Sequence, residues 1–148
     1  MSLLRNRKAN FEYIILDKYD AGIVLTGNEV KSIRNSDATI SDSFVFIKDN
    51  EVWIRNFKIS RYKQAHHTYP HEENRDKKLL LTKRQINKIS KSLKEKGITC
   101  IPLNVFIKSN RIKVKIGLAK GKKLYDKRNS IKDRDLNRDS KRQLSYKN

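Results

Sequence analysis

The stretch that decides the fold reads Arg111-Ile112-Lys113-Val114-Lys115-Ile116-Gly117-Leu118. Branched apolar residues alternate with cations along it, and successive side chains of a strand point to opposite faces of a sheet. It therefore predicts a strand with one face in the core and a basic ribbon on the other. Ser109-Asn110 joins it to an apolar strand at residues 101–107, so we expect a hairpin. Pro102 cannot donate to a ladder and is expected at a strand start or edge.

Two more strand pairs are predicted nearer the N-terminus. The first joins residues 11–16 and 21–25 across the polar stretch 17–20, as a hairpin. The second joins residues 43–47 and 52–57 across a turn at 48–51. Most aromatic rings in the strands are expected in the core, namely Phe11, Phe44, Phe46, Trp53, Phe57 and Phe106.

Two helices carry their own start signals. Thr26 and Glu29 have the spacing of a capping box, and so do Thr82 and Gln85. Gly97 is expected to cap the second helix at its C-terminal end. About six strands with about three helices predict a mainly β fold, an OB-fold-like small closed barrel. We expect the barrel over residues 1–119 and a basic tail over 120–148.

The charge of the chain points to a polyanionic partner. The formal net charge is +19, and the tail holds 11 Lys or Arg against 4 Asp with few apolar groups to bury. RNA or DNA is favoured over a merely solubilising surface, and an anionic membrane is the lesser alternative. We expect the tail to stay disordered until a polyanion folds it into a helix.

Several classes of protein are disfavoured. Cys100 is the single cysteine, so no internal disulfide forms, and a buried structural thiol is expected there. The N-terminus lacks the apolar segment of a signal peptide, and no apolar run reaches the length of a spanning helix, which predicts a soluble cytoplasmic protein.

Catalytic and metal-binding patterns are weak. His66, His67 and His71 fit a solvated, mobile loop at residues 62–77 better than a metal site. The glycine-containing exit from the last strand, residues 117–122, leaves a phosphate contact and a plain strand end equally open. No phosphate-binding or nucleophile motif occurs, so we expect a binding protein without cofactor or metal, not an enzyme. Four tyrosines beside charged residues could stack on unpaired bases: Tyr19, Tyr62, Tyr69 and Tyr125.

Several blocks, in order over about residues 6–135, resemble the small protein B family, which binds transfer-messenger RNA. They are Asn6-Arg7-Lys8-Ala9, residues 21–34 (AGIVLTGNEVKSIR), residues 40–45 (ISDSFV), residues 75–81 (RDKKLLL), residues 113–123 (KVKIGLAKGKK) and Tyr125-Asp126-Lys127-Arg128.

The resemblance implies an OB-type barrel bound to the tRNA-like end of transfer-messenger RNA. It implies trans-translation, in which a stalled ribosome is rescued and its incomplete product is tagged. The tail would enter the empty mRNA channel beside the decoding centre and ribosomal RNA. The protein would act as a monomer and meet alanyl-tRNA synthetase and elongation factor Tu indirectly, through the RNA.

The resemblance also assigns residues. Asp20 and Leu80 match positions tied to RNA binding, Thr82 replaces a common Asn and is expected mainly as a cap, and Tyr125 stands where His is frequent. With the local cations, the predicted RNA contacts are Asn6, Arg7, Lys8, Tyr19, Asp20, Lys31, Ser32, Arg34, Lys77, Lys78, Leu80, Thr82, Lys120, Gly121, Lys122 and Lys123. The predicted ribosome contacts in the tail are Tyr125, Asp126, Lys127 and Arg128.

Three alternatives stay open at this point. A basic ribosomal structural protein would carry a similar tail and charge. A general single-strand RNA binder of the cold-shock type would prefer unstructured RNA to a folded elbow. An RNA-directed hydrolase would need a catalytic set that these motifs do not offer.

Overall fold

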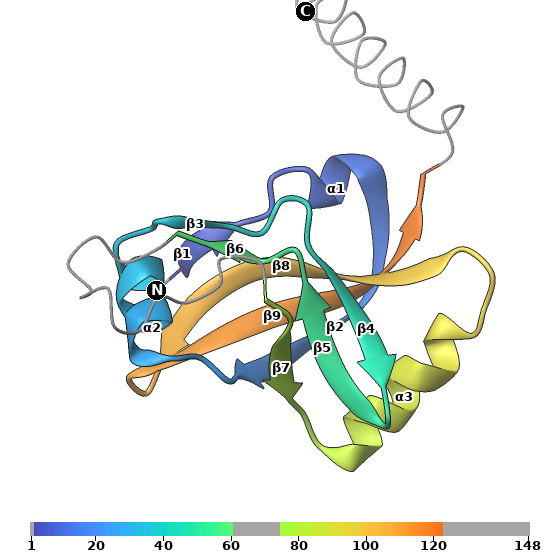
Figure 1. Cartoon of the computed structure of the whole chain (residues 1–148). Helices are drawn as coiled ribbons and strands as arrows, with labels where there is room; N and C mark the ends of the chain where they lie inside the picture. Colours follow the sequence, from blue (N-terminus) through green and yellow to red (C-terminus); the bar gives the residue numbers. More distant parts are fainter. Residues whose placement is uncertain (1, 61–74, 123–148) are drawn as a thin grey trace, which may run out of the picture.

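The computed structural model describes residues 2–60 and 75–122. Its elements are β1 (Ser2–Arg5), α1 (Ala9–Glu12), β2 (Tyr13–Ile23), α2 (Gly27–Arg34), β3 (Ala38–Thr39), β4 (Phe44–Lys48), β5 (Glu51–Arg55), β6 (Lys58–Ile59), β7 (Lys77–Leu80), α3 (Lys83–Leu93), β8 (Ile98–Lys108) and β9 (Arg111–Gly121) (Figure 1). The fold is mainly β with three helices among the described residues, as predicted.

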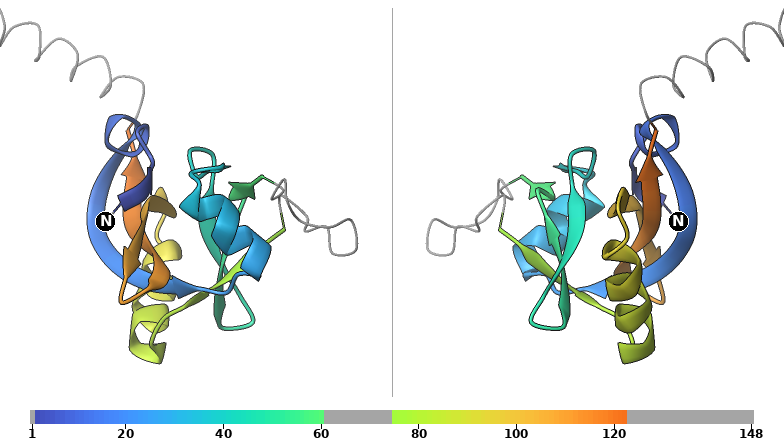
Figure 2. Two further views of the ribbon diagram at one scale, coloured as in Figure 1. Left: turned by 90° about the vertical axis from the view of Figure 1, so that its left-hand side faces the viewer. Right: turned by 90° about the vertical axis from the view of Figure 1, so that its right-hand side faces the viewer.

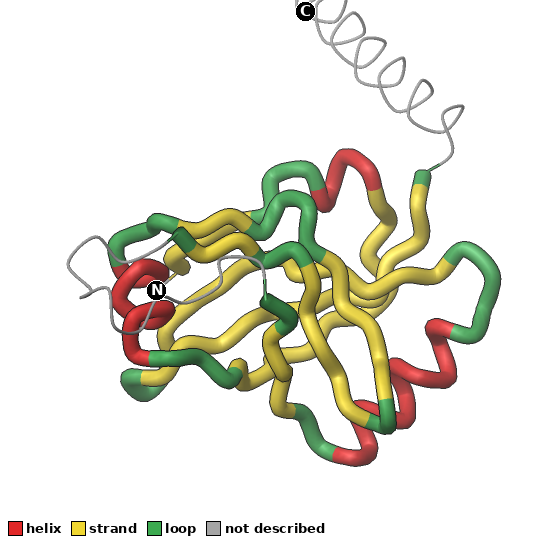
Figure 3. The backbone as a smooth tube through the Cα atoms, in the orientation of Figure 1, coloured by secondary structure: helices red, strands yellow, loops and turns green. Residues whose placement is uncertain are grey.

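The strand pairings close into a ring. The order is β8-β4-β5-β7-β2-β9, and β9 pairs back onto β8. β1 pairs with the edge of β8 opposite β9. Every pair is antiparallel. Figure 3 shows the strands (yellow) gathered together with the helices (red) at their margins. The short strands β3 and β6 form a separate pair. Figure 2 shows the long β2 (blue) curving round one side of the ring beside β9 (orange).

The alternation in β9 is confirmed. Ile112, Val114, Ile116 and Leu118 are buried in the core, whereas Arg111 is exposed and Lys113 and Lys115 are partly exposed on the other face. The turn before β9 has positive φ at both Ser109 and Asn110, 52° and 60°. Two such residues in a row give the backbone twist that a two-residue hairpin requires.

Residues 11–25 do not form the predicted hairpin. β2 is one continuous strand, and Phe11 lies before it in α1 with 44% of its surface exposed. The polar stretch at 17–20 fits the strand because Tyr19 packs inward against the core, while Lys18 and Asp20 are exposed. The pairing of β2 with β9 shifts register between Ile15 and Asp17, as at a β-bulge, just where the polar stretch begins.

Pro102 is also placed differently from the prediction. It lies buried in the middle of β8, opposite Ile116, where the register shifts between Pro102 and Asn104. A bulge is the other position in a sheet that tolerates a residue without an amide hydrogen. Nothing in the local sequence marks the bulge.

The aromatic rings lie mostly outside the core. Phe57 is fully buried, but the other four strand rings, Phe44, Phe46, Trp53 and Phe106, are only partly buried. They alternate with smaller branched residues that face inward, such as Val45 and Ile54. The core of this small ring is therefore built mainly from Val and Ile, and most of the aromatic residues lie nearer its outer surface.

Both helix start signals are confirmed. Each capping box has its two reciprocal hydrogen bonds, at Thr26 with Glu29 and at Thr82 with Gln85. α3 ends at Leu93, and Gly97 lies three residues past its C-cap, in the turn before β8, with φ +85°. Over residues 2–60 and 75–122, no helix has the length and apolar character needed to cross a membrane.

Candidate nucleic-acid interface

The outward face of β9 carries a row of cations, here called the basic ribbon: Arg111, Lys113 and Lys115. β9 lies between β2 and β8, so the ribbon has neighbours on both sides. Lys113 is opposite Gly22, and Lys115 is opposite Asp20, with its Nζ 3.9 Å from Asp20 Oδ1. The Lys115 ammonium also lies 5.9 Å from the centroid of the Phe106 ring. A row of cations across a sheet is suited to phosphate contacts.

At one end of the ribbon is a cavity of about 490 Å³, the Leu80 pocket. Its apolar lining comes from Leu80, Ile23, Leu25, Val30 and Ile112, and Arg111 and Lys113 lie in the same lining. Leu80 is 52% exposed, so its side chain is accessible in this lining.

Gly22 makes this arrangement possible. A Cβ at position 22 would lie 3.2 Å from Leu80 Cβ, so a larger residue would push the Leu80 side chain away. Leu80, Gly22 and Lys113 are direct partners across β7, β2 and β9, in one row. An apolar floor beside cations can receive an unpaired base and its phosphate together.

At the other end is a cavity of about 470 Å³, the basic groove. Arg5, Arg7, Lys18 and Lys115 line it, and no carboxylate occurs among its described lining residues. Lys115 thus belongs both to the ribbon and to the groove. The Leu80 pocket, the basic ribbon and the basic groove together form one continuous surface, which we call the cationic face.

The structure brings four of the predicted RNA contacts to the cationic face. Asp20 and Leu80 flank the ribbon, and Arg7 lines the basic groove. Asn6 also lines the groove, and its Nδ2 donates to the Pro102 carbonyl at 2.9 Å, which ties the segment before α1 to β8. Thr82 follows two residues after Leu80, and its hydroxyl accepts from the Gln85 amide at 3.2 Å, which confirms the expected capping role.

Tyr19 does not present the exposed ring that its sequence context predicts. Its ring packs against the core, and its hydroxyl donates to Asp17 Oδ2 at 2.9 Å. Burial, then the hydrogen bond and the charge of Asp17, raises the pKa of Tyr19 to about 12. Stacking on a base is therefore not the use that this geometry favours.

Lys77 and Ser32 are buried, so the prediction that their side chains contact RNA is wrong for this structure. The Lys77 ammonium donates to the carbonyls of Phe57 at 2.8 Å and Arg75 at 2.9 Å. It also lies 4.0 Å from the fully buried carboxylate of Glu29. In the sequence, a lysine in a polar run resembles a surface residue, and the inward position follows only from the strand register.

Glu29 is the centre of this buried charge network. Its Oε1 accepts from the Arg75 guanidinium and from the Thr26 amide. Burial by itself would raise the pKa of Glu29, but the hydrogen bonds from Arg75 and Thr26, with the charges of Arg75 and Lys77, lower it below its ordinary value. The network joins α2 to the start of β7 and so helps to place Leu80.

The remaining predicted contacts are dispersed. Lys31 and Arg34 are exposed on α2, and Lys78 pairs with Glu51 at 3.1 Å. Lys120 and Gly121 end β9, and the Lys122 ammonium donates to the Asn10 carbonyl of α1 at 3.1 Å. Lys8 is exposed just before α1, with its Nζ 4.0 Å from Asp42 Oδ1. Ten further predicted residues lie outside the described residues: Lys123, Tyr125, Asp126, Lys127, Arg128, Tyr62, Tyr69, His66, His67 and His71.

Sequence reasoning did not assign Arg5, Lys18, Arg111, Lys113 or Lys115 as contacts, although the alternation in β9 already placed the last three on one face. Cys100 is buried, as expected, and burial raises the pKa of its thiol to about 12. The described part of the chain holds no cluster of three or more His, Cys, Asp or Glu side chains suited to a metal ion.

Comparisons with known proteins agree with this picture. The family model described as "SmpB protein" matches residues 3–146. The chain is 48% identical to the SsrA-binding protein of Streptococcus mutans over 97% of its own length and 92% of the relative. It is 43% identical to that of Treponema denticola, over 98% and 94% of the two chains. A chain in a solved structure described as "tmRNA-SmpB: a journey to the center of the bacterial ribosome" is similar with a TM-score of 0.69 and 35% identity, covering 84% of this chain and 87% of that one.

Proposed function

The chain belongs to the SmpB family, and from this premise we propose that it binds the tRNA-like part of transfer-messenger RNA and delivers it to stalled ribosomes for trans-translation. The observation that carries the proposal is the similarity over nearly the whole chain to SsrA-binding proteins. The cationic face supplies a physical basis for it. Folded RNA is recognised largely through its shape and backbone, and unpaired bases are stacked or hydrogen-bonded separately.

Each part of the cationic face has a role in this proposal. The basic ribbon and the basic groove contact phosphates, because their cations are exposed or partly exposed and extend across neighbouring strands. The Leu80 pocket receives an unstacked part of the folded RNA elbow beside Arg111 and Lys113. Asp20 holds Lys115 over the sheet and leaves the ammonium partly exposed.

The ribosomal steps are also part of the proposal. The basic tail senses an empty mRNA channel near the decoding centre and becomes helical there, through Tyr125, Asp126, Lys127 and Arg128. The protein acts as a cytoplasmic monomer without catalytic activity of its own. Alanyl-tRNA synthetase and elongation factor Tu act on the same particle through the RNA. The tail's excess of cations supports entry into an RNA-lined path.

A double substitution in the ribbon tests the RNA-binding step. Lys113→Ala with Lys115→Ala removes two phosphate contacts, so the slope of log affinity against log salt should fall in magnitude by roughly 1.4 to 1.8. Affinity for a transfer-messenger RNA fragment containing the tRNA-like domain should fall at least several-fold at moderate salt. The measurement is fluorescence anisotropy over a salt series.

The matched control is Lys88→Ala with Lys91→Ala, which makes the same charge change on the exposed side of α3. It should change the affinity only slightly and leave the slope near that of wild type. Equal losses for the two double variants would mean that binding follows net charge alone, and the assignment of the cationic face would be wrong. Binding of arbitrary duplexes as tightly as the tRNA-like domain would reject the proposed function itself.

A further inference from the structure

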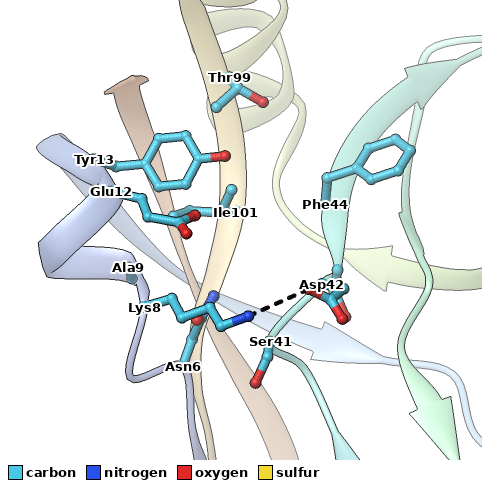
Figure 4. A pocket seen from close by; sticks show the side chains of 11 residues that line it. Asn6, Lys8, Ala9, Glu12, Tyr13, Ser41, Asp42, Phe44, Thr99 and Ile101 are labelled. Atoms are coloured by element: carbon cyan, nitrogen blue, oxygen red, sulfur yellow. Dashed lines mark ion pairs between the residues drawn. The ribbon is translucent and has the colours of Figure 1, made fainter. Parts of the chain in front are cut away.

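A third cavity lies apart from the Leu80 pocket, between α1 and β8 on one side and the segment that leads into β4 on the other (Figure 4). Its volume is about 240 Å³, and we call it the side pocket. It meets the basic groove through two shared lining residues, Asn6 and Ala9. Its volume is below the range typical of drug-sized ligands and suits one small flat group.

Two aromatic side chains flank the side pocket. Figure 4 shows Tyr13 and Phe44 on opposite sides of the opening, with the Tyr13 hydroxyl directed into it and the Phe44 ring turned away from Tyr13. Both residues are only partly buried. Ile101 and Ala9, which are buried, give the pocket an apolar base. A flat ring that enters this space can stack on an aromatic wall without displacing either strand.

The polar groups of the pocket are mainly acceptors. Asn6 Oδ1 is buried and has no hydrogen-bond partner among the described residues. The orientation of the Asn6 amide is set, because its Nδ2 already donates to Pro102. Glu12 and Asp42 add carboxylates to the lining. The carboxylates in the lining favour a ligand with N–H donors.

The mouth of the pocket can change its contacts at little cost. Lys8 Nζ lies 4.0 Å from Asp42 Oδ1, and the two side chains are 59% and 86% exposed. An exposed pair at this distance contributes little to stability, so Lys8 can turn to a phosphate when a nucleotide enters. The cation and the acceptors thus face different parts of one nucleotide.

We propose that the side pocket binds a single unpaired RNA base that carries an exocyclic amino group. Adenine, cytosine and guanine each have such a donor, whereas the corresponding position of uracil is a carbonyl acceptor, which would meet the acceptors of the pocket. The base stacks on Tyr13, its amino group donates to the Glu12 carboxylate, and Lys8 contacts its phosphate. The inference rests on the proposed function in that an RNA partner supplies the base.

The test uses the full chain and four fluorescent RNA pentamers that are uridine except at the centre, where they carry U, C, A or G. Every pentamer has the same number of phosphates, so the electrostatic part of binding cancels in the ratio of affinities. We expect the best amino-bearing base to bind about tenfold more tightly than uracil, a difference of about 1.4 kcal/mol.

Glu12→Gln should lower this ratio to about threefold or less. Its matched control is Glu95→Gln, which removes the same charge from an exposed site outside the pocket lining and should keep the ratio near ten. Tyr13→Leu should weaken all four pentamers together by about fivefold or more, because it removes the stacking ring while keeping apolar bulk. Its control is Phe46→Leu, which makes a similar change at a partly buried ring outside the pocket lining.

Four equal wild-type affinities, or ratios that do not change in Glu12→Gln, would overturn the inference. Those results would leave the proposed function intact if the tRNA-like domain still binds with the salt slope expected of the cationic face. Loss of binding to that domain, with base discrimination preserved, would overturn the proposed function and leave the base-binding side pocket intact.

Discussion

Replacing Lys77 by methionine should destabilise the protein strongly, although methionine keeps most of the side chain's volume. The Lys77 ammonium is fully buried and donates to two backbone carbonyls, those of Phe57 and Arg75. Methionine would leave both carbonyls without this donor inside the protein, and each orphaned buried acceptor costs about 1–3 kcal/mol. Glu29 would also lose the compensating charge 4.0 Å from its Oε2.

The expected loss is roughly 3–5 kcal/mol, the range measured when one partner of a buried charge pair is removed. This is a large share of the roughly 5–15 kcal/mol that stabilises a typical domain. With a urea m-value of about 2 kcal/mol per molar, the unfolding midpoint should fall by about 1.5–2.5 M. Trp53 is the single tryptophan of the chain, so its fluorescence can follow the transition.

Lys78→Met is the matched control, since it makes the same chemical change at the next residue. Lys78 is partly exposed and pairs with Glu51 at the surface, so its loss should cost about 0–1 kcal/mol. Equal midpoints for the two variants would refute the burial of Lys77. A stable Lys77→Met protein whose salt slope with RNA falls by about one unit would restore the sequence-based assignment of Lys77 as a phosphate contact.

Two further predictions concern pH and the tail. The folded-state pKa of Glu29 lies below its ordinary value of 4.5, so the ionised carboxylate stabilises the fold fully above about pH 4.5, and this stabilisation is lost as the pH falls through the folded-state pKa. Urea midpoints measured from pH 7 to pH 3 should therefore drop less steeply in Glu29→Gln than in wild type. Parallel curves for the two proteins would contradict this. Truncation after Leu124 should leave affinity for the tRNA-like domain nearly unchanged but abolish rescue of stalled ribosomes in a purified translation system. Equal loss of both activities would show that the ring of strands and the tail do not act separately.

The parts of the fold that follow from the sequence are those with strong local causes. The alternation in β9, the turn at Ser109-Asn110 and the two capping boxes each depend on neighbouring residues, and all are present. The errors arise where tertiary packing decides. The polar stretch at 17–20 predicts the end of a strand, but Tyr19 packs against the core and β2 continues. Where polar and aromatic residues are mixed in this way, the local pattern does not show which face will be enclosed when the sheet closes on itself.

The candidate site likewise combines features that local sequence predicts with features that only tertiary packing creates. Asp20 and Leu80 entered through resemblance to a family, and the register then aligned them with the basic ribbon across β2, β7 and β9. The ribbon itself is visible in the alternation. The side pocket is not visible, because its walls come from residues near 13, 44 and 101, which the ring of strands brings together. Cavities between distant segments depend on the whole topology.

β7 connects the buried network to the cationic face. Its inward residues, Lys77 and Leu79, are fully enclosed, while Lys78 and Leu80 point outward. Only two residue pairs join β7 to β2, so the ladder alone holds this edge of the Leu80 pocket weakly. The contacts of Glu29 with Arg75 and Lys77 fasten α2 to the start of the same strand. These ion pairs therefore help to fix the position of Leu80, and weakening them should loosen the proposed RNA binding as well as the fold.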